Sequence, residues 1–217
     1  MLAALAAVSA NARQVACFDF DGTLTPADTL GPFLRETAGT GALLRAFAAD
    51  APRLLFAAIG RSSRDAAKER MLRRLFAGRD LSDLAVRGRA YGDRVAEQQL
   101  RPDMIARLRW HEAEGHEVAI VSASLDLYVD RVAERLRVPT VLCSRLAVDA
   151  EGRVTGRLVG GNCRGPAKLA RIREHFGADG YEFWAYGDSA GDAEMLAAAE
   201  HPIRVGRVGR LRRFPTP

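Results

Sequence analysis

The sequence predicts an α/β fold, in which a parallel sheet is flanked by helices and a helical segment is inserted after the first strand. Strand-like apolar runs alternate with helix-like segments from residue 102 onward, and a short apolar strand lies at 15–20. Helical spacing extends through residues 31–99. We therefore predict one core, formed by residues 1–30 and 100–217, and one helical cap, formed by residues 31–99.

The predicted elements follow the chain in a regular order. Residues 15–20 form the first strand, and the segment RDAAKERMLRRLFAG within the cap has helical spacing and ends at Gly78, as a helix would. After Pro102, the predicted helices are 102–115, 125–138, 165–177 and 190–200. The predicted strands are 116–124, 139–148, 181–189 and 202–206, with a hairpin over 146–160 that turns near Glu151 and Gly152.

Length and composition indicate a protein with a sizeable core. The 217 residues are 48% hydrophobic, which suffices for one domain of ordinary size plus an insertion. The net charge of +5 comes mainly from arginine, since the chain has only two lysines, Lys68 and Lys168. Because the arginines are interspersed with acidic residues and form no stripe with aromatic residues, we expect no nucleic-acid partner.

The cysteines and the chain ends bear on location. Three cysteines far apart in the chain fit reduced thiols better than disulfides, and they predict a cytoplasmic protein. The opening MLAALAAVSANA lacks the basic start and the length of a signal peptide, so we expect a short extension. The stretch GALLRAFAADAPRLLFAAIG is too interrupted to span a bilayer. The basic tail IRVGRVGRLRRF would suit a peripheral membrane contact or an acidic partner, and the oligomeric state is left open.

Acidic and hydroxyl side chains recur where the predicted strands end. In the stretch VACFDFDGTLT, Asp19 and Asp21 lie where the first strand ends, and their alternation places them on the same side. The strand at 116–124 ends with Ser122 and Ser124, and the strand at 181–189 leads into Asp188 and Asp192. Carboxylates that converge on one sheet edge repel each other unless a cation lies between them. Oxygen ligands without histidine or cysteine favour Mg²⁺.

Lys168 adds a positive charge to this edge. In a chain that strongly prefers arginine, a lysine in the first turn of a helix indicates a need for a compact point charge. A magnesium ion, a lysine, hydroxyl groups and free backbone N–H groups together make a phosphate site. Asp19 is then a candidate nucleophile, since a carboxylate can accept a phosphoryl group, and Asp21 is a candidate proton donor and acceptor.

Four segments in this order, DFDGTLT, VSAS, Lys168 and YGDSAGD, resemble the four motifs of the haloacid dehalogenase-like superfamily. The resemblance covers residues 14–30 and about 100–205. It implies a Rossmann-like core, an aspartyl-phosphate intermediate and Mg²⁺. It also implies the residue roles: Asp19 as nucleophile and metal ligand, Asp21 as general acid and base with its backbone carbonyl on the metal, Ser122, Ala123 and Lys168 as phosphate ligands, Asp188 as a metal ligand, Asp192 as support for the metal, and Thr23 as a residue that fixes the loop.

The predicted cap resembles that of the phosphoserine-phosphatase-like branch of this superfamily. Asp28 falls where the branch places an acidic residue that contacts the substrate, and Arg70 is a candidate for a substrate carboxylate, with a solvated helix arginine as the equal alternative. VSAS and GDSAGD depart from the motifs usual in phosphoserine phosphatases, which leaves the substrate open. DTLGPFLR and NCRGPAK resemble uncharacterised hydrolases of the branch and bacterial phosphatidylglycerophosphatases of the C type.

The expected function is therefore a magnesium-dependent phosphomonoester hydrolase that acts on a small or lipid-linked phosphate. A phosphotransferase, in which an alcohol accepts the phosphoryl group, is the alternative enzyme. A catalytically silent phosphate-binding protein is the alternative from another class. The set of Asp19, Asp21, Lys168 and Asp188 argues against the silent protein, which has no need to hold carboxylates together.

Overall fold

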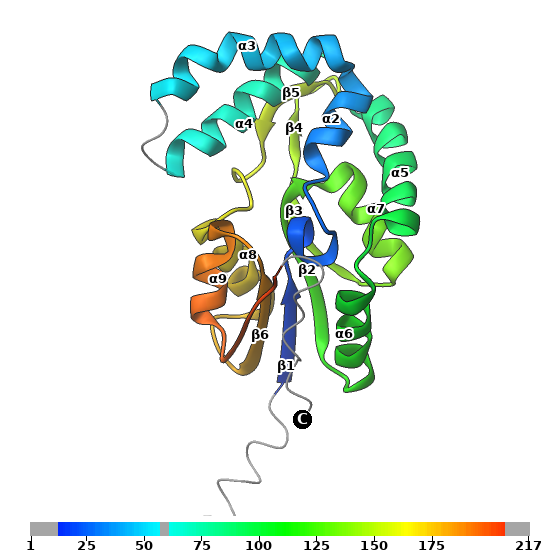
Figure 1. Ribbon diagram of the computed structural model, residues 1–217, viewed down its shortest axis with the longest axis vertical. Coiled ribbons are helices and arrows are strands. Elements are labelled where there is room, and N and C mark those ends of the chain that lie inside the picture. Colours follow the sequence, from blue (N-terminus) through cyan, green and yellow to red (C-terminus); the bar gives the residue numbers. More distant parts are fainter. Residues whose placement is uncertain (1–12, 57–60, 207–217) are drawn as a thin grey trace, which may run out of the picture.

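The computed structural model describes residues 13–56 and 61–206, and it consists of a parallel sheet with helices on both faces and further helices beyond one end of the strands (Figure 1). The expected N-terminal extension and the basic tail after residue 206 lie outside the described residues, as do residues 57–60 of the apolar stretch. Within the described part of the chain, no helix is long and apolar enough to cross a membrane.

The main sheet has its first strand at its centre. Over the described ranges, this sheet has five parallel strands in the order β3-β2-β1-β6-β7. They are β1 Arg13–Phe18, β2 Glu117–Leu125, β3 Thr140–Ser144, β6 Tyr181–Gly187 and β7 His201–Arg204. Alternate residues of β1 face two different hydrophobic clusters. Val15 and Cys17 belong to one cluster, and Ala16 and Phe18 belong to the other. The apolar run at 15–18 is therefore explained by burial on both faces of the sheet.

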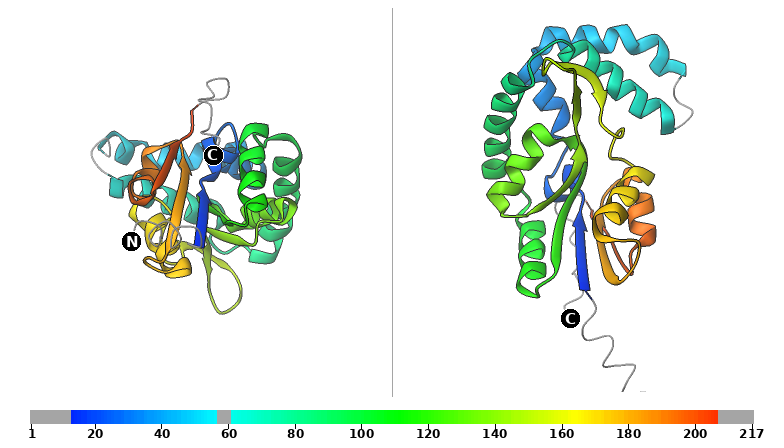
Figure 2. Two further views of the ribbon diagram at one scale, coloured as in Figure 1. Left: turned by 90° about the horizontal axis from the view of Figure 1, so that it is seen from below. Right: turned by 180° about the vertical axis from the view of Figure 1, so that it is seen from behind.

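Helices cover both faces of the sheet (Figure 2). On one face lie α6 Pro102–Ala113 and α7 Asp126–Leu136, whose apolar side chains join the cluster of Ala16 and Phe18. On the other face lie α8 Pro166–Phe176 and α9 Ala193–Ala198, which pack with Val15 and Cys17. A short 3₁₀ turn, Ala190–Asp192, precedes α9, so the helix expected at 190–200 begins with a tighter turn.

After the first strand, the chain forms a group of helices beyond the carboxyl ends of the sheet before it returns to α6 and the second strand (Figure 1). They are α2 Leu30–Ala38, α3 Thr40–Phe56, α4 Arg61–Phe76 and α5 Leu81–Gln98, and we call them the helical insertion. Local signals set their ends. Gly78 follows α4 with a positive φ of 79°, and the Asp80 carboxylate accepts a hydrogen bond of 2.7 Å from Ser82 N at the start of α5.

A hairpin leaves the core and reaches the helical insertion. The single strand expected at 139–148 is two strands, because the chain turns away from the sheet after β3, and β4 Leu146–Val148 pairs with β5 Val154–Leu158 in a separate antiparallel sheet. Val154 exchanges hydrogen bonds of 2.8 Å with the segment that follows α4, from Gly78 N and to Arg79 O. Gly156 has a positive φ of 79° and lies against the α4 backbone, where a Cβ would come within 2.2 Å of Arg73 Cα.

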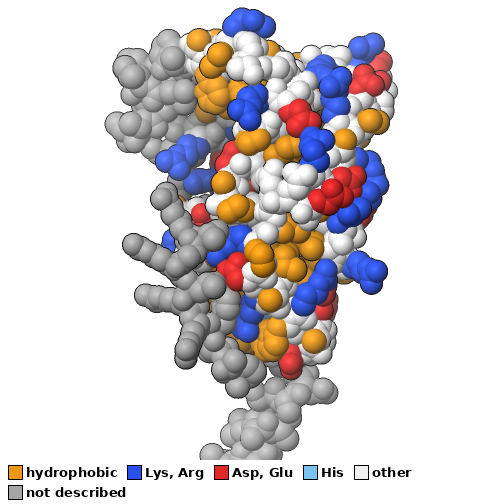
Figure 3. Space-filling view, turned by 45° about the vertical axis from the view of Figure 1, so that its right-hand side comes forward, with side chains coloured by type: hydrophobic (Ala, Val, Ile, Leu, Met, Phe, Trp, Pro, Cys, Tyr) orange, Lys and Arg blue, Asp and Glu red, His pale blue; other side chains and the backbone are white. Residues whose placement is uncertain are grey.

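The helical insertion also packs closely on the core through α5 and α7. Gly88 and Gly92 of α5 face the α7 backbone, and a Cβ on Gly88 would lie 2.3 Å from Leu127 O. Ion pairs surround this contact, including Arg89–Glu134 at 3.0 Å. Acidic and basic side chains are interspersed over this face of the molecule (Figure 3). The small glycine residues therefore allow the two helices to approach, and the charged rim stays in solvent.

Candidate active site

A cavity of about 940 Å³ lies at the carboxyl ends of β1, β2 and β6. Ligands bind at this edge in open parallel sheets, where neighbouring connections leave a central strand in opposite directions. Its wall contains most of the residues singled out from the sequence: Asp19, Asp21, Asp28, Ser122, Ala123, Lys168, Asp188 and Asp192. The strand ends therefore bring these residues to one place.

Lys168 bridges two carboxylates in the cavity wall. Its side chain is 2% exposed, and its Nζ lies 2.5 Å from Asp19 Oδ1 and 2.6 Å from Asp192 Oδ1. Burial lowers the pKa of Lys168, but Asp19 and Asp192 outweigh burial and hold that pKa above its usual value. Burial raises the pKa of Asp19 to about 7, although Lys168 opposes this rise. The site thus holds a fixed cation beside a buried carboxyl group.

Three carboxylates at this position lie close enough together to share one cation. Oxygen atoms of Asp19, Asp188 and Asp192 lie within 4.8 Å of one another. Asp188 Oδ1 is buried and has no hydrogen-bond partner among the described residues. Gly22, with a positive φ of 81°, lies so close that a Cβ would come within 2.2 Å of Asp188 Oδ2. An unpaired buried oxygen in an all-oxygen cluster fits a hard divalent cation such as Mg²⁺.

Asp21 is placed by a turn and by hydrogen bonds rather than by strand alternation. The strand ends at Phe18, and Asp21 lies in the following turn with its carboxylate held from two sides. Oδ1 accepts from Thr29 N at 2.7 Å and from Thr29 Oγ1 at 2.6 Å, and Oδ2 accepts from Ser124 Oγ at 2.5 Å. Burial raises the pKa of Asp21, while the hydrogen bonds from Ser124 and Thr29 oppose the rise.

The end of β2 bulges at the cavity. Ser122 pairs with Cys143 and Leu125 pairs with Ser144, so Ala123 and Ser124 have no partner residue in β3. Within the bulge, Ser124 N donates a hydrogen bond of 2.9 Å to Ser122 Oγ. The Ser122 hydroxyl therefore already accepts a bond, and its own proton is available to a ligand in the cavity.

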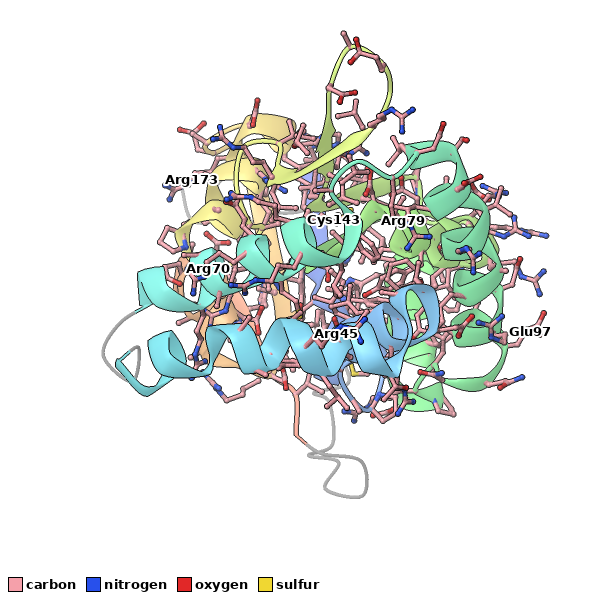
Figure 4. All side chains as sticks on the ribbon, turned by 90° about the horizontal axis from the view of Figure 1, so that it is seen from above. Arg45, Arg70, Arg79, Glu97, Cys143 and Arg173 are labelled. Carbon is pink, nitrogen blue, oxygen red and sulfur yellow. The ribbon has the colours of Figure 1, made fainter. Side chains whose placement is uncertain are left out.

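Three further residues expected at the site have different positions. Thr23 is buried and donates a hydrogen bond of 3.2 Å to Asp19 Oδ2. Asp28 is exposed, and its carboxylate accepts from Gly31 N at 2.8 Å, where it caps the start of α2 beside the cavity. Arg70 lies on α4, which crosses over the end of the sheet, and it is not among the cavity-lining residues (Figure 4).

Sequence reasoning missed Lys68, the other lysine of the chain. Lys68 lies on α4, and its Nζ donates hydrogen bonds to Ala123 O and, at 2.7 Å, to Asn162 Oδ1. The scarcity of lysine, which singled out Lys168, is a signal that applies equally to Lys68. Thr29 was also missed, because a threonine that follows a loop carries no signal of its own in the sequence.

The fold is a Rossmann-like core with a helical insertion after the first strand. A family model described as haloacid dehalogenase-like hydrolase matches residues 16–197, so the chain belongs to this family. Protein CicA of Caulobacter vibrioides is 38% identical over 84% of this chain and 82% of its own length. A probable phosphatase of Mycobacterium tuberculosis is 35% identical over 46% of this chain and 34% of its own length.

Solved structures share the same architecture. A Bordetella pertussis protein of unknown function is 26% identical with a TM-score of 0.74, and the match covers 89% of this chain and 90% of that one. A structure described as a phospho-aspartyl intermediate analogue of phosphoserine phosphatase is 19% identical with a TM-score of 0.56, covering 87% and 84%. The fold is thus that of the phosphoserine-phosphatase-like branch.

Proposed function

We propose that the protein is a magnesium-dependent phosphatase that works through an aspartyl-phosphate on Asp19. The observation that carries the proposal is the buried Lys168 between Asp19 and Asp192, beside the unpaired oxygen of Asp188. This arrangement combines a nucleophile, a fixed cation and a place for a metal ion in one cavity. Hydrolysis of a phosphomonoester needs all three, because both the phosphate and the attacking carboxylate are negatively charged.

In the first step, an Asp19 oxygen attacks phosphorus and the bond from phosphorus to the leaving oxygen breaks. Lys168 and the Ser122 hydroxyl are placed to stabilise the negative charge on the phosphoryl oxygens, together with the backbone N–H of Ala123. Asp21 gives its proton to the leaving oxygen. The raised pKa of Asp21 supports this role, since a general acid must be protonated when the reaction begins.

In the second step, Asp21 takes a proton from water, whose oxygen attacks phosphorus. The bond from phosphorus to Asp19 then breaks, which releases phosphate and restores the carboxylate. The Thr29 and Ser124 hydrogen bonds hold the Asp21 carboxylate throughout. Fixed orientation of a proton carrier is a large part of what such a site contributes to the rate.

Mg²⁺ would be held by the Asp19 and Asp188 carboxylates and the backbone carbonyl of Asp21, with Asp192 as support. When bound, it screens the repulsion between the substrate phosphate and the carboxylates. Its charge would also lower the pKa of Asp19, which favours the ionised nucleophile.

The substrate proposed is a small phosphomonoester. A cavity of about 940 Å³ is in the range of small-molecule sites. The name of the mycobacterial relative, a probable phosphatase, supports the same chemistry. A lipid-linked phosphate is the alternative substrate, supported by the exposed apolar side chains of Leu44 and Phe47 on α3.

We also propose that the enzyme is cytoplasmic, because Cys17, Cys143 and Cys163 are free, buried thiols.

The test is phosphate release from a panel of phosphomonoesters with and without Mg²⁺. The panel contains phosphoserine, glycerol phosphates, sugar phosphates, nucleotides and phosphatidylglycerophosphate. We expect release that depends on Mg²⁺ and that falls by roughly a thousandfold or more in Asp19→Asn, because the amide cannot attack phosphorus. Asp126→Asn, a change on α7 outside the cavity wall, is the matched control and should retain activity.

Two further measurements separate the mechanism from its alternatives. Acid-quenched wild type should carry a phosphoryl group that hydroxylamine removes, as an acyl phosphate does, and Asp19→Asn should carry none. Product analysis with an added alcohol identifies a phosphotransferase. Full activity in Asp19→Asn would contradict the assignment of Asp19 as the nucleophile. Phosphate binding without hydrolysis of any phosphomonoester would favour the catalytically silent binding protein.

A further inference from the structure

Lys68 connects the helical insertion to the end of β2. Its ammonium group extends from α4 and donates to the carbonyl oxygen of Ala123, inside the bulge that follows Ser122. Ala123 and Ser124 have no partner residue in β3, and the register of β1 with β2 ends at Ile120. The bulge therefore depends on hydrogen bonds from outside the sheet, and Lys68 supplies one of them.

The peptide between Ala123 and Ser124 is held on both of its sides. Its carbonyl oxygen accepts from Lys68, and its N–H, which belongs to Ser124, donates to Ser122 Oγ at 2.9 Å. The Ser124 side chain in turn donates to Asp21 Oδ2 at 2.5 Å. The orientation of this one peptide thus affects both the proposed phosphate ligand Ser122 and the proposed proton carrier Asp21.

The hydrogen bond from Lys68 to Ala123 O belongs to a larger hydrogen-bond network between α4 and the core. Asn162, in the loop before α8, offers its Oδ1 to Lys68 at 2.7 Å and to Ser144 Oγ at 2.9 Å. Its Nδ2 donates to Asp65 Oδ1 at 2.7 Å. Asp65 and Lys68 lie one turn apart on α4, so this helix holds both ends of one core amide group.

We propose that Lys68 is a positioning residue for the reaction, contributed by α4, which fixes the Ala123–Ser124 peptide so that the phosphate site is complete only while α4 is docked on the core. The inference rests on the proposed function. Lys68 is not among the cavity-lining residues, so it would act through the bulge. Through Lys68, the reaction requires that the helical insertion be correctly docked on the core.

The environment of Lys68 supports this assignment. Burial lowers the pKa of Lys68 to about 8, while the charges of Asp21 and Asp65 oppose the fall. Burying an ammonium group costs free energy unless hydrogen bonds replace its contacts with water, and Lys68 donates to Ala123 O and Asn162 Oδ1. A lysine can place its compact ammonium against one carbonyl and one amide, whereas the planar fork of arginine suits carboxylates and phosphates. This difference explains why lysine remains here in a chain rich in arginine.

The test compares Lys68→Met with Arg64→Met, a matched change at an exposed position one turn earlier on α4. Para-nitrophenyl phosphate is the substrate, because its simple leaving group offers little for the helical insertion to recognise. We expect kcat to fall roughly tenfold or more in Lys68→Met with a much smaller change in KM. Arg64→Met should keep both constants. In Lys68→Ala, added methylamine or ethylamine should restore part of kcat, which a general loss of stability would not allow.

A second readout does not need activity. Hydrogen exchange at the Ser124 amide should be faster in Lys68→Met than in wild type and unchanged in Arg64→Met, because the peptide loses a hold on its carbonyl side. If Lys68→Met does not fold, Lys68→Gln is the second variant, with the same direction expected. Unchanged kcat together with unchanged exchange overturns the inference. Wild type that releases no phosphate from any ester overturns the proposed function instead, and the exchange measurement still decides whether Lys68 holds the bulge.

Discussion

At the scale of single residues, the site depends on charges that are buried only because their partners are buried with them. Lys168 remains a cation at 2% exposure because Asp19 and Asp192 flank its ammonium. Removing one member of such a group leaves an uncompensated buried charge, which is strongly destabilising. Asp188 differs, since its Oδ1 has no partner among the described residues, and a bound cation would supply one.

Asp188 provides the first prediction at this scale. Mg²⁺ at about ten times its Kd should stabilise the wild type by about 1.4 kcal/mol. The midpoint temperature of thermal unfolding should then rise by about 2–4 °C for each kcal/mol of stabilisation. In Asp188→Asn this rise should be largely lost, because a neutral amide binds Mg²⁺ poorly. The control variant Asp130→Asn, on α7, should show the full rise with Mg²⁺. A full rise in Asp188→Asn would mean that Asp188 is not a metal ligand.

Most of the proposed site could be predicted from the sequence, because strand ends in a parallel sheet must meet at one edge. Asp19 and Asp188 follow this rule, and Lys168 joins them in one cavity wall from the first turn of α8. Lys68 could not be placed in the same way, because it belongs to a helix whose position relative to the sheet depends on tertiary packing. Asp21 reaches the cavity by a different route from the one expected, since hydrogen bonds from Thr29 and Ser124 place it.

At the scale of elements, glycine residues decide how closely helices approach. Gly88 of α5 lies against Leu127 O of α7, where no side chain can fit without a shift of backbone. In contrast, a Cβ on Gly41 near the start of α3 would make only an ordinary contact, with Arg45 Nη1 at 3.5 Å as the nearest atom. The same substitution should therefore destabilise the protein at Gly88 but not at Gly41.

Gly88→Ala should lower the free energy of unfolding by about 1–3 kcal/mol, because the added methyl forces α5 away from α7. Gly41→Ala should be neutral or stabilising by up to about 1 kcal/mol, since alanine favours the helix. Urea unfolding followed by circular dichroism measures both. Equal effects of the two changes would mean that the contact between α5 and α7 adapts easily.

Element types were predicted better than element ends. Apolar periodicity and the signals at Pro102 and Gly78 define helices that the structure contains. The hairpin expected over 146–160 is present as β4 and β5. The break between β3 and β4 was not predicted, because no glycine or proline lies between residues 140 and 148 to mark a turn. What separates these strands is the pairing of β4 with β5, a contact that only the folded chain makes.

At the scale of the whole molecule, a buried histidine links folding to pH. His111 is fully buried in α6, with its ring nitrogens 2.7 Å from His116 Nδ1 and 2.8 Å from the Tyr186 hydroxyl. Burial, with the nearby charges of Arg107 and His116, lowers the pKa of His111 to about 3. The unfolded chain therefore binds a proton at His111 between about pH 3 and about pH 6.5 that the folded chain does not.

The contribution of His111 to stability should be complete above about pH 6.5 and should fall as the pH decreases below it. The slope for one such group is at most about 1.4 kcal/mol per pH unit. Other groups, such as Asp19, change with opposite sign, so the measurement is a difference. Between pH 7.5 and pH 5, wild type should lose more unfolding free energy in urea than His111→Gln does. The exposed His175→Gln should follow the wild type, and parallel slopes for all three would exclude His111.

The shared hydrophobic cluster has a consequence for how the chain can be divided. Phe33, Leu72 and Leu84 of the helical insertion belong to the same cluster as Ala16 and Phe18 of the central strand. Two parts that share their apolar contacts gain and lose them together, so neither has a complete interior of its own. The helical insertion is therefore not a detachable module, and a chain shortened by its removal would expose a cut surface of the cluster instead of forming a smaller working enzyme.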